Sequence, residues 1–323
     1  MKDRLFPQDQ QTRDIARELY SHVVELPIIS PHGHTDPNWF ASNTAFANPA
    51  ELFVTPDHYL FRMLYSQGVR LEDLGISRLD GGEIETDPRK IWRTFASHYF
   101  LFRATPTALW IDHSLQEVFG VTDPLNAKTA DAIYDRIDGC LKLPEFRPRA
   151  LFENFNIEVL ATTEGALDPL EAHKNIQASG WGGRVITTYR PDTVIDPETP
   201  GFAENLVRLG EMTGEDTSSW RGYLQAHRKR RAEFKAHGAT ATDHGHPTAR
   251  TEDLSRSDAA ELFDRALAGR LSPEEADLFR GQMLTEMARM SIDDGLVMQL
   301  HPGSVRNHNP AVFSTFGRDK GFD

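Results

Sequence analysis

The second half of the chain alternates short strand patterns with helical patterns, and this alternation restricts the fold more than any other feature. The runs IEVLATTE and RVITTYRPD, rich in β-branched residues, flank GALDPLEAHKNIQASGWG, which has the length and spacing of one crossover helix. A helical region at 202–234 precedes the weakly strand-like GATATDHG, and another at 257–293 precedes the apolar GLVMQLHPGS. Repeated strand–helix–strand units build a parallel sheet, so the sequence predicts an α/β fold.

The first half is mostly helical, with one strand near its start. Residues 9–25 predict an opening helix, because apolar side chains recur there at helical spacing. The apolar run that begins at Ile28, between Pro27 and Pro31, is too short for a helix and predicts a buried strand. Helical spacing between turn signals then dominates residues 48–149.

Two histidines, His32 and His34, stand at the carboxyl end of that first strand, in the sequence PHGHTDP. In an extended chain alternate side chains point the same way, so both imidazoles share one side, and Gly33 adds no bulk between them. This arrangement suits a two-nitrogen clamp for a divalent metal. The tripeptide alone equally fits two histidines that end a strand and form hydrogen bonds to loops.

Polar groups recur at the same relative place in each predicted strand–helix unit. In parallel sheets, functional groups collect at the carboxyl ends of the strands. The second to fifth predicted strands end, in chain order, at Glu164, Arg190, Asp243 with His244, and His301. His301 by itself is also typical of a core or rim histidine, but its place in line with the His-x-His segment favours a shared site.

Composition excludes several classes of function. The 323 residues carry a formal net charge of −13, which argues against nucleic acid as a partner but not against a small anionic substrate. The charged first residues lack the apolar core of a signal peptide, and no stretch approaches a membrane span, so we expect a cytoplasmic protein without a membrane partner. The single cysteine, Cys140, excludes an internal disulfide and a cysteine-based zinc site, so a metal here would use histidines and carboxylates.

Eight segments, spread in order over nearly the whole chain, resemble the uronate isomerases of the amidohydrolase superfamily. They are PHGHTDP, DHYLFRMLYSQGV, FGVTDPLN, LATTE, YRPD, TDHG, MQLHPGSVRNHN and FGRDKGFD. The second strand departs from the family, because Thr162–Ala166 reads TTEGA where the family has Thr-Thr-Asp-Asp-Pro. The resemblance implies aldose–ketose isomerisation of D-glucuronate to D-fructuronate and of D-galacturonate to D-tagaturonate.

The resemblance also implies a fold, the (β/α)₈ TIM barrel of metal-dependent hydrolases. Residues 1–323 are then one barrel-type domain that carries a helical insertion at 41–150. Since the sequence predicts about five strands, we expect an incomplete barrel whose closing strands, with the family's Asp-x-Arg motif, lie outside this chain. Activity is expected to depend on completion of the barrel.

Carried over residue by residue, the resemblance assigns roles to seven side chains. It makes His32, His34 and His301 metal ligands, His58 and Tyr59 catalytic residues, and Arg190 and Arg306 substrate-binding residues. From the residues alone, DHYLFR instead predicts a helix start with Asp57 as N-cap and Tyr59 and Phe61 as packing groups. One divalent metal is implied, zinc first, with manganese or cobalt as alternatives, because availability often decides among the ions that imidazoles bind.

The implied chemistry suits these residue types. A divalent ion held by neutral imidazoles polarises a carbonyl and stabilises the charge that develops when a proton moves between adjacent carbons. A guanidinium meets a carboxylate by two parallel hydrogen bonds, which suits Arg190 for the carboxylate of a uronate. Two other functions stay open: a metal-dependent hydrolase of the same superfamily, and an inactive module that binds a sugar acid. The preferred uronate, the physiological metal and a homo-oligomer also stay open.

Overall fold

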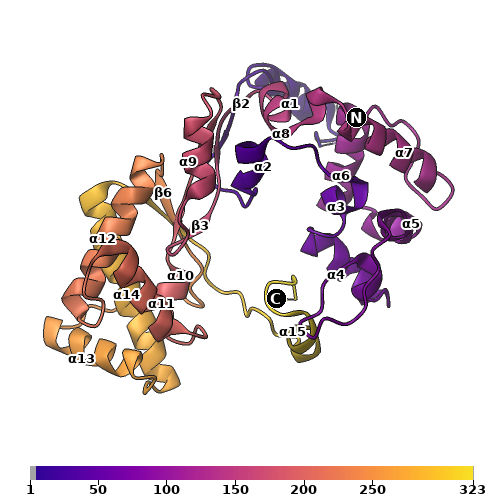
Figure 1. Ribbon diagram of the computed structural model, residues 1–323. Helices are drawn as coiled ribbons and strands as arrows, with labels where there is room; N and C mark the ends of the chain where they lie inside the picture. The colour runs from indigo at the N-terminus through magenta and orange to yellow at the C-terminus, as the bar shows by residue number, and fades with distance from the viewer. Residues whose placement is uncertain (1–4, 323) are drawn as a thin grey trace.

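The computed structural model describes residues 5–322 and shows two bodies that are joined at both ends (Figure 1). The strand body consists of residues 157–300 together with the strand at 28–30. The helical body consists of residues 49–141 together with the helix at 310–316. Figure 1 shows the two bodies connected near α2 and α8 at one end and by the segment before α15 at the other.

The secondary structure follows the predicted order. The strands are β1 Ile28–Ser30, β2 Ile157–Ala161, β3 Glu164–Gly165, β4 Arg184–Ile186, β5 Tyr189–Arg190, β6 Ala241–His244 and β7 Val297–Leu300. The helices of the first half are α1 Gln10–Ser21, α2 Pro37–Ser42, α3 Pro49–Phe53, α4 His58–Ser66, α5 Pro88–His98, α6 Pro106–His113, α7 Ala130–Leu141 and α8 Pro148–Asn154. The remaining helices are α9 Glu171–Ala178, α10 Asp192–Ile195, α11 Phe202–Thr213, α12 Trp220–Ala236, α13 Arg256–Leu267, α14 Pro273–Asp294 and α15 Pro310–Phe316.

Parallel pairing joins all the strands, in the orders β1-β2-β4 and β3-β5-β6-β7. Two predicted strands are each divided in two, β2 from β3 and β4 from β5. Backbone hydrogen bonds bridge the interruption, from Thr162 N to Ile186 O at 2.8 Å and from Glu164 N to Thr188 O at 3.1 Å. The described segments therefore occupy five strand positions in sequence order, which agrees with the α/β fold and the strand count predicted from the sequence.

The sheet curves so that its first and last strands approach each other at their carboxyl ends. The side-chain amide of Gln299, on β7, donates to the carbonyl oxygen of Pro31, just after β1, at 3.1 Å. Its Oε1 lies 2.9 Å from Nδ1 of His32. Because β1 and β7 stand at opposite ends of the strand order, these contacts reach across the concave side of the sheet.

The prediction that the first strand is buried is wrong among the described residues. Ile28 and Ile29 keep 49% and 61% of their surface exposed, whereas all four residues of β6 are buried. The reason is position, since β1 pairs only with β2 and is an edge strand, while β6 lies between β5 and β7. The opening helix α1 forms as predicted, but it buries none of its residues in the described structure.

Several helices of the first half begin with the same N-capping arrangement. A side-chain oxygen before the helix accepts a hydrogen bond from a backbone N–H of the first turn, and proline occupies the first helical position, where its missing N–H costs nothing. This start occurs at Asp36–Pro37, Asn48–Pro49, Asp87–Pro88 and Thr105–Pro106. The described helices include none long and apolar enough to cross a membrane.

Each body has its own hydrophobic core, and the last helix belongs to the core that is distant in sequence. Apolar residues between Ala50 and Leu141 form the core of the helical body, and Val312 and Phe316 of α15 pack into it. A separate cluster between Ala166 and Leu296 packs α11–α14 onto the strands. The chain therefore leaves β7, crosses to the helical body and is held there by burial (Figure 1).

Glu164 is a buried carboxyl group on the side of the sheet that α9 covers. It is 6% exposed, accepts a hydrogen bond from Thr187 Oγ1, and lies 3.7 Å from Nε2 of His173 on α9. Burial raises the pKa of Glu164 to about 7, although hydrogen bonds from Thr187 and Thr162 oppose the shift. Burial lowers the pKa of His173 to about 4, so the two groups do not form an ion pair near neutral pH.

We predict that Glu164→Gln makes stability less dependent on pH. The pKa of Glu164 is 4.5 when unperturbed and about 7 in the folded protein, so the protonated acid stabilises the fold below about pH 4.5 and this contribution is lost as the pH rises through 7. At pH 8 the uncharged variant should have a free energy of unfolding on the order of 1–3 kcal/mol higher than the wild type. Urea unfolding at pH 5 and pH 8 measures the effect.

The exposed Glu158 on β2 provides the matched control, because Glu158→Gln removes a carboxylate from the same strand without removing a buried one. This control should leave the pH dependence of unfolding unchanged. Parallel pH profiles for the wild type and Glu164→Gln would show that the prediction is wrong.

Candidate functional site

Three side chains from two distant parts of the sequence form a candidate metal centre at the carboxyl ends of the strands. They are His32 and His34, which follow β1, and Asp243, on β6. Their ligand atoms all lie within 4.8 Å of one another. Imidazole nitrogens and a carboxylate oxygen at such distances fit the ligand set of a divalent transition metal, so the residues present suit the ion that the sequence implies.

The hydrogen bonds of Gln299 fix which nitrogen of His32 is free. Gln299 uses its amide N–H to reach Pro31 O, so the atom that faces His32 is its carbonyl oxygen, which can only accept. Nδ1 of His32 must therefore carry the proton, and Nε2 keeps its lone pair. A ligand histidine whose other nitrogen donates to a neighbouring oxygen is the usual arrangement around a protein-bound metal.

The carboxylate of Asp243 is fully buried and has two charged or ionisable neighbours. Arg190 Nη1 donates to Oδ2 at 3.0 Å. Oδ1 lies 2.8 Å from Nε2 of His301, although no hydrogen bond of suitable geometry joins these atoms in the described structure. One oxygen is therefore held by an arginine, and the other faces the histidines.

The electrostatic surroundings of His34 favour its neutral form. Partial burial lowers the pKa of His34, and the nearby imidazole of His32 and guanidinium of Arg190 lower it further. The ring of His34 lies 5.0 Å from that of His32 between centroids, nearly perpendicular to it. A neutral imidazole is the form that binds a metal, so the site requires little proton release from this ligand.

His301 lies against the triad rather than within it. Its ring centroid is 4.9 Å from that of His32, and its backbone N–H donates to His244 O at 2.9 Å, continuing the ladder between β6 and β7. The structure thus brings together His32, His34 and His301, as the sequence predicted. The role of His301 as a metal ligand stays a prediction.

His58 and Tyr59 lie at the start of α4, in the helical body. Asp57 caps this helix by accepting from the N–H of Tyr59 at 2.8 Å, as the residues alone predicted. Tyr59 is nevertheless not a packing group, because 54% of its surface is exposed and its ring lies 4.4 Å from that of His58. Among the described contacts, none joins either residue to the triad, so their catalytic roles stay predictions.

The two predicted substrate-binding arginines have different surroundings. Arg190 is three-quarters buried and already binds two carboxylates, Asp192 through Nε at 2.7 Å and Asp243 through Nη1 at 3.0 Å. Arg306 lies in the segment between β7 and α15, with a side chain that is 41% exposed and 3.8 Å from Asp319. Arg306 therefore has the greater freedom to meet a ligand.

Two strand-end residues do not join the site. Glu164 contacts His173 of α9 instead of the triad. His244 alternates with Asp243 along β6, so it points to the opposite side, where its Nε2 lies 2.9 Å from Thr242 Oγ1. Burial lowers the pKa of His244 well below its ordinary value, which fits an uncharged histidine packed under the sheet.

Sequence reasoning placed Asp243 at a strand end but did not assign it to the metal, and it missed Gln299 and Asp192 altogether. Asp243 alternates with His244, and period-two alternation shows that only one of them faces the histidines, without showing which. Gln299 is the one polar residue inside an apolar strand, a signal that could have marked it.

Comparisons with known proteins agree on one family. The sequence model of the glucuronate isomerase family matches residues 5–323. A protein named uronate isomerase from Mesorhizobium japonicum is 63% identical over 321 residues, which are 99% of this chain and 68% of that protein. A uronate isomerase from Rhizobium meliloti is 58% identical over 321 residues, with the same shares of 99% and 68%.

Solved structures give the same result. The crystal structure of glucuronate isomerase from Caulobacter crescentus matches with a TM-score of 0.97 and 56% identity, over 100% of this chain and 67% of that one. The crystal structure of uronate isomerase from Thermotoga maritima matches with a TM-score of 0.90 and 27% identity, over 100% of this chain and 68% of that one. The chain thus spans about two thirds of the length of these relatives.

We predict that the protein binds one divalent metal and that His32→Ala combined with His34→Ala abolishes binding. Removing two neutral ligands leaves Asp243 with too few partners for a stable site. Elemental analysis of the purified proteins measures the metal content. His98→Ala combined with His113→Ala, on α5 and α6 of the helical body, is the control and should retain the wild-type content. Equal metal content in both double variants would place the metal elsewhere.

Proposed function

The chain belongs to the glucuronate isomerase family, whose activity is the isomerisation of uronates, and we propose how its residues serve this reaction. The site at His32, His34 and Asp243 is proposed to hold the divalent metal on which the reaction depends. The proposed reactions convert D-glucuronate to D-fructuronate and D-galacturonate to D-tagaturonate. The observation that carries the proposal is the convergence of these three ligand atoms at the carboxyl ends of the strands. Zinc is the proposed metal, with manganese or cobalt as alternatives.

The reaction moves a carbonyl from C1 to C2 of a sugar, so a proton must leave one carbon and return to its neighbour. A divalent ion supplies a Lewis acid that favours the charge developing on the sugar oxygens. The chain's own residues orient this centre: Gln299 holds His32 in one tautomer, and Arg190 holds one oxygen of Asp243. His301, at 2.8 Å from Asp243, is proposed as a further residue of this centre.

Tyr59 and His58 are proposed to serve the proton transfers. The phenol of Tyr59 can donate a hydrogen bond or a proton to a sugar oxygen, and its exposure leaves it accessible. His58 lies beside it, with ring centroids 4.4 Å apart. Their place on α4 supports a site between the helical body and the strand ends, where a substrate contacts both.

The carboxylate of the uronate is proposed to bind Arg306 and the remaining guanidinium donors of Arg190. Arg190 uses Nε and Nη1 to bind Asp192 and Asp243. The two hydrogen bonds to the substrate carboxylate that the sequence predicted are therefore assigned to Nη2 of Arg190 and to Arg306. Within residues 5–322, the ion-pair partner of Arg306 is Asp319, at a distance of 3.8 Å. A charge-assisted hydrogen bond to a carboxylate is about twice as strong as a neutral one, which suits an anionic substrate.

A (β/α)₈ barrel with a helical insertion at 41–150 is the proposed complete architecture. The parallel strands follow one another in sequence order, and the sheet curves until Gln299 meets Pro31. Both outer strands expose apolar side chains, 61% of Ile29 on β1 and 64% of Val297 on β7. Among the described residues β1 and β7 each pair with one strand, so their outer edges are open to further pairing, and the proposed partners are the closing strands of the barrel.

We predict that the metal-loaded protein with a complete barrel converts D-glucuronate to a keto sugar and that a chelator stops the reaction until metal is restored. The expected product is D-fructuronate, identified by chromatography against a standard. A panel of amide and ester substrates, incubated in parallel, tests metal-dependent hydrolysis, and no turnover is expected there. Hydrolysis without isomerisation would overturn the proposed function, and binding of glucuronate without any turnover would favour a sugar-acid-binding module.

Arg306→Met should weaken the use of uronates by about ten- to a hundred-fold in kcat/KM, because one charge-assisted bond to the carboxylate is lost. Arg306 is the cleaner variant for this question, since replacing Arg190 would also remove the partner of Asp243. The metal content of Arg306→Met should equal that of the wild type. Arg318→Met, just after α15, is the control, and equal losses in both variants would show a general effect of charge.

A further inference from the structure

Arg190 is shared between two carboxylates that have different environments. Its Nη1 donates to Oδ2 of Asp243, which is fully buried, and its Nε donates to Oδ2 of Asp192, whose side chain is 26% exposed. A buried carboxylate needs a partner of opposite charge, because removing it from water is costly. The position of Arg190 therefore sets the orientation of Asp243.

Asp192 anchors Arg190 and the end of β6 at the same time. Besides binding Arg190, its two carboxylate oxygens accept the backbone N–H of Gly245 at 3.1 and 3.2 Å. Gly245 comes one residue after β6, whose last residues include Asp243. One side chain thus ties the guanidinium that binds Asp243 to the backbone that carries Asp243.

The residue at position 245 has to be small for this arrangement. A Cβ atom there would lie 2.7 Å from Arg190 Nη2 and 2.7 Å from Asp192 Oδ2, closer than side-chain carbons approach in proteins. Neither of these atoms can move freely, because both belong to the charged pair. Glycine at 245 therefore permits the close approach of Arg190, Asp192 and the chain after β6.

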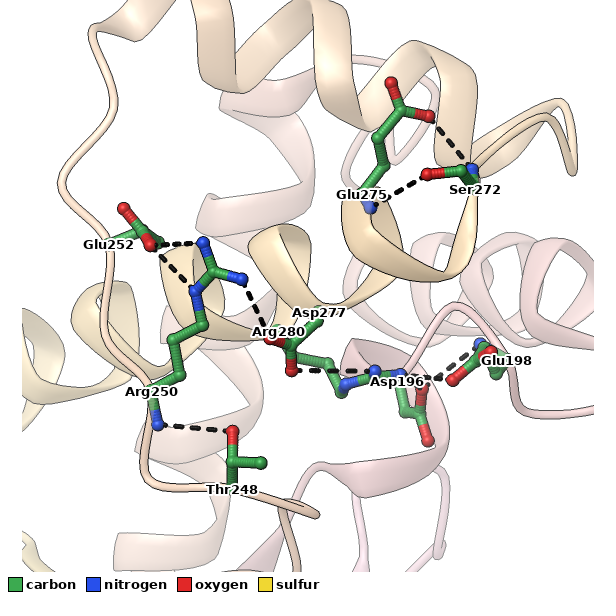
Figure 2. A network of polar contacts seen from close by, with 9 residues as sticks. All are labelled: Asp196, Glu198, Thr248, Arg250, Glu252, Ser272, Glu275, Asp277 and Arg280. Carbon is green, nitrogen blue, oxygen red and sulfur yellow. Dashed lines mark hydrogen bonds and ion pairs between the residues drawn. The ribbon is translucent and has the colours of Figure 1, made fainter.

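Asp192 is in turn held by the body of the protein. It begins α10, whose residues Val194 and Ile195 are buried in the core of the strand body. Arg280, on α14, binds the residues that follow this helix, donating to Asp196 at 3.0 Å and to Glu198 at 2.6 Å (Figure 2). The segment that carries Asp192 is thus fixed from the outer helix layer.

We propose that Asp192 is a positioning residue of the metal centre, which acts through Arg190 to orient Asp243 for the ion. The inference rests on the proposed metal site, and it assigns Asp192 a role that the ligand set does not include. Asp192 also contributes its charge. With two carboxylates and one guanidinium, the group keeps a net negative charge beside the neutral histidines, and this charge favours a cation.

The test is the affinity of Asp192→Asn for Zn²⁺, measured by competition with a chelating dye. The asparagine keeps the size of the side chain but loses the charge that holds Arg190, so Arg190 can turn away from Asp243 and the site becomes one unit more positive. Partners that orient metal ligands typically change metal affinity by about 10- to 100-fold, and a loss in that range is expected. A dissociation constant within twofold of the wild type, in a folded variant, would overturn the proposal.

Asp294→Asn is the matched control, because Asp294 makes the same kinds of contact at the opposite end of the sheet. Its side chain is 22% exposed, binds the buried Arg231 at 2.6 Å, and accepts from the N–H of Leu296 at 3.0 Å, just before β7. This control should lower the unfolding temperature without changing the affinity for Zn²⁺. Equal losses of affinity in both aspartate variants would show a general effect of destabilisation and would overturn the proposal.

Gly245→Ala answers the same question if Asp192→Asn does not fold. It leaves both charges in place but forces Arg190 and Asp192 apart, so a weaker Zn²⁺ affinity is expected here too, and an unchanged affinity would overturn the proposal. Because Zn²⁺ binding is read without any sugar, this test is independent of the isomerase assay. A wild-type protein that binds Zn²⁺ but does not isomerise glucuronate would contradict the proposed function alone.

Discussion

The buried carboxylate of Asp243 imposes the requirement that organises the site. A buried carboxylate needs a positively charged partner, and the side chain of that partner must in turn be kept in position by a further contact. Arg190 meets the first need and Asp192 the second, while Gly245 leaves the room in which they meet. Each of these residues comes from the end of β5 or β6, so the charged group exists only where two parallel strands end side by side.

Parallel pairing extends this requirement to the rest of the strand body. In the ladder between β6 and β7, Asp243 stands opposite Gln299, so both side chains point to the concave side of the sheet. Gln299 then contacts His32, which follows the first strand in the chain. The curvature of the sheet thus brings the first and last strands to one centre, and the metal ligands meet although more than 200 residues separate them in sequence.

The helical body contributes to the site through its attachment rather than through its core. The segment after β7 carries Arg306 across to α15, and the burial of Val312 and Phe316 fixes its far end. The side chain of Arg62, on α4, donates to the carbonyl oxygen of Gly321 at 3.0 Å, so the helix that presents His58 and Tyr59 is bound to the end of the same segment. Arg306 therefore lies on the connection between the two bodies, and the chain just beyond α15 is bound to the helix that carries His58 and Tyr59.

The sequence by itself determined the α/β class, the order of the elements and the strand-end positions of the histidines. These properties depend on local periodicity, which is determined by residues close together in the sequence. It could also place Asp57 as an N-cap, because a cap involves only the next few N–H groups. Where the structure differs from the sequence prediction, the difference lies in the surroundings of a residue and not in its secondary structure. Ile28 and Ile29 were expected to be buried, and Glu164 was expected at the shared site, yet the first strand is an edge and Glu164 faces α9.

Only the tertiary structure decided which strand-end groups meet. Alternation along β6 allows either Asp243 or His244 to face the histidines, and the choice follows from how the sheet curves and which face the helices cover. The pairing of Arg190 with Asp192 and Asp243 could not be predicted from the sequence either. An arginine at a strand end has the same local sequence pattern whether it binds a substrate or a carboxylate of its own chain. Sequence patterns report neighbours along the chain, whereas a charge is paired by neighbours in space.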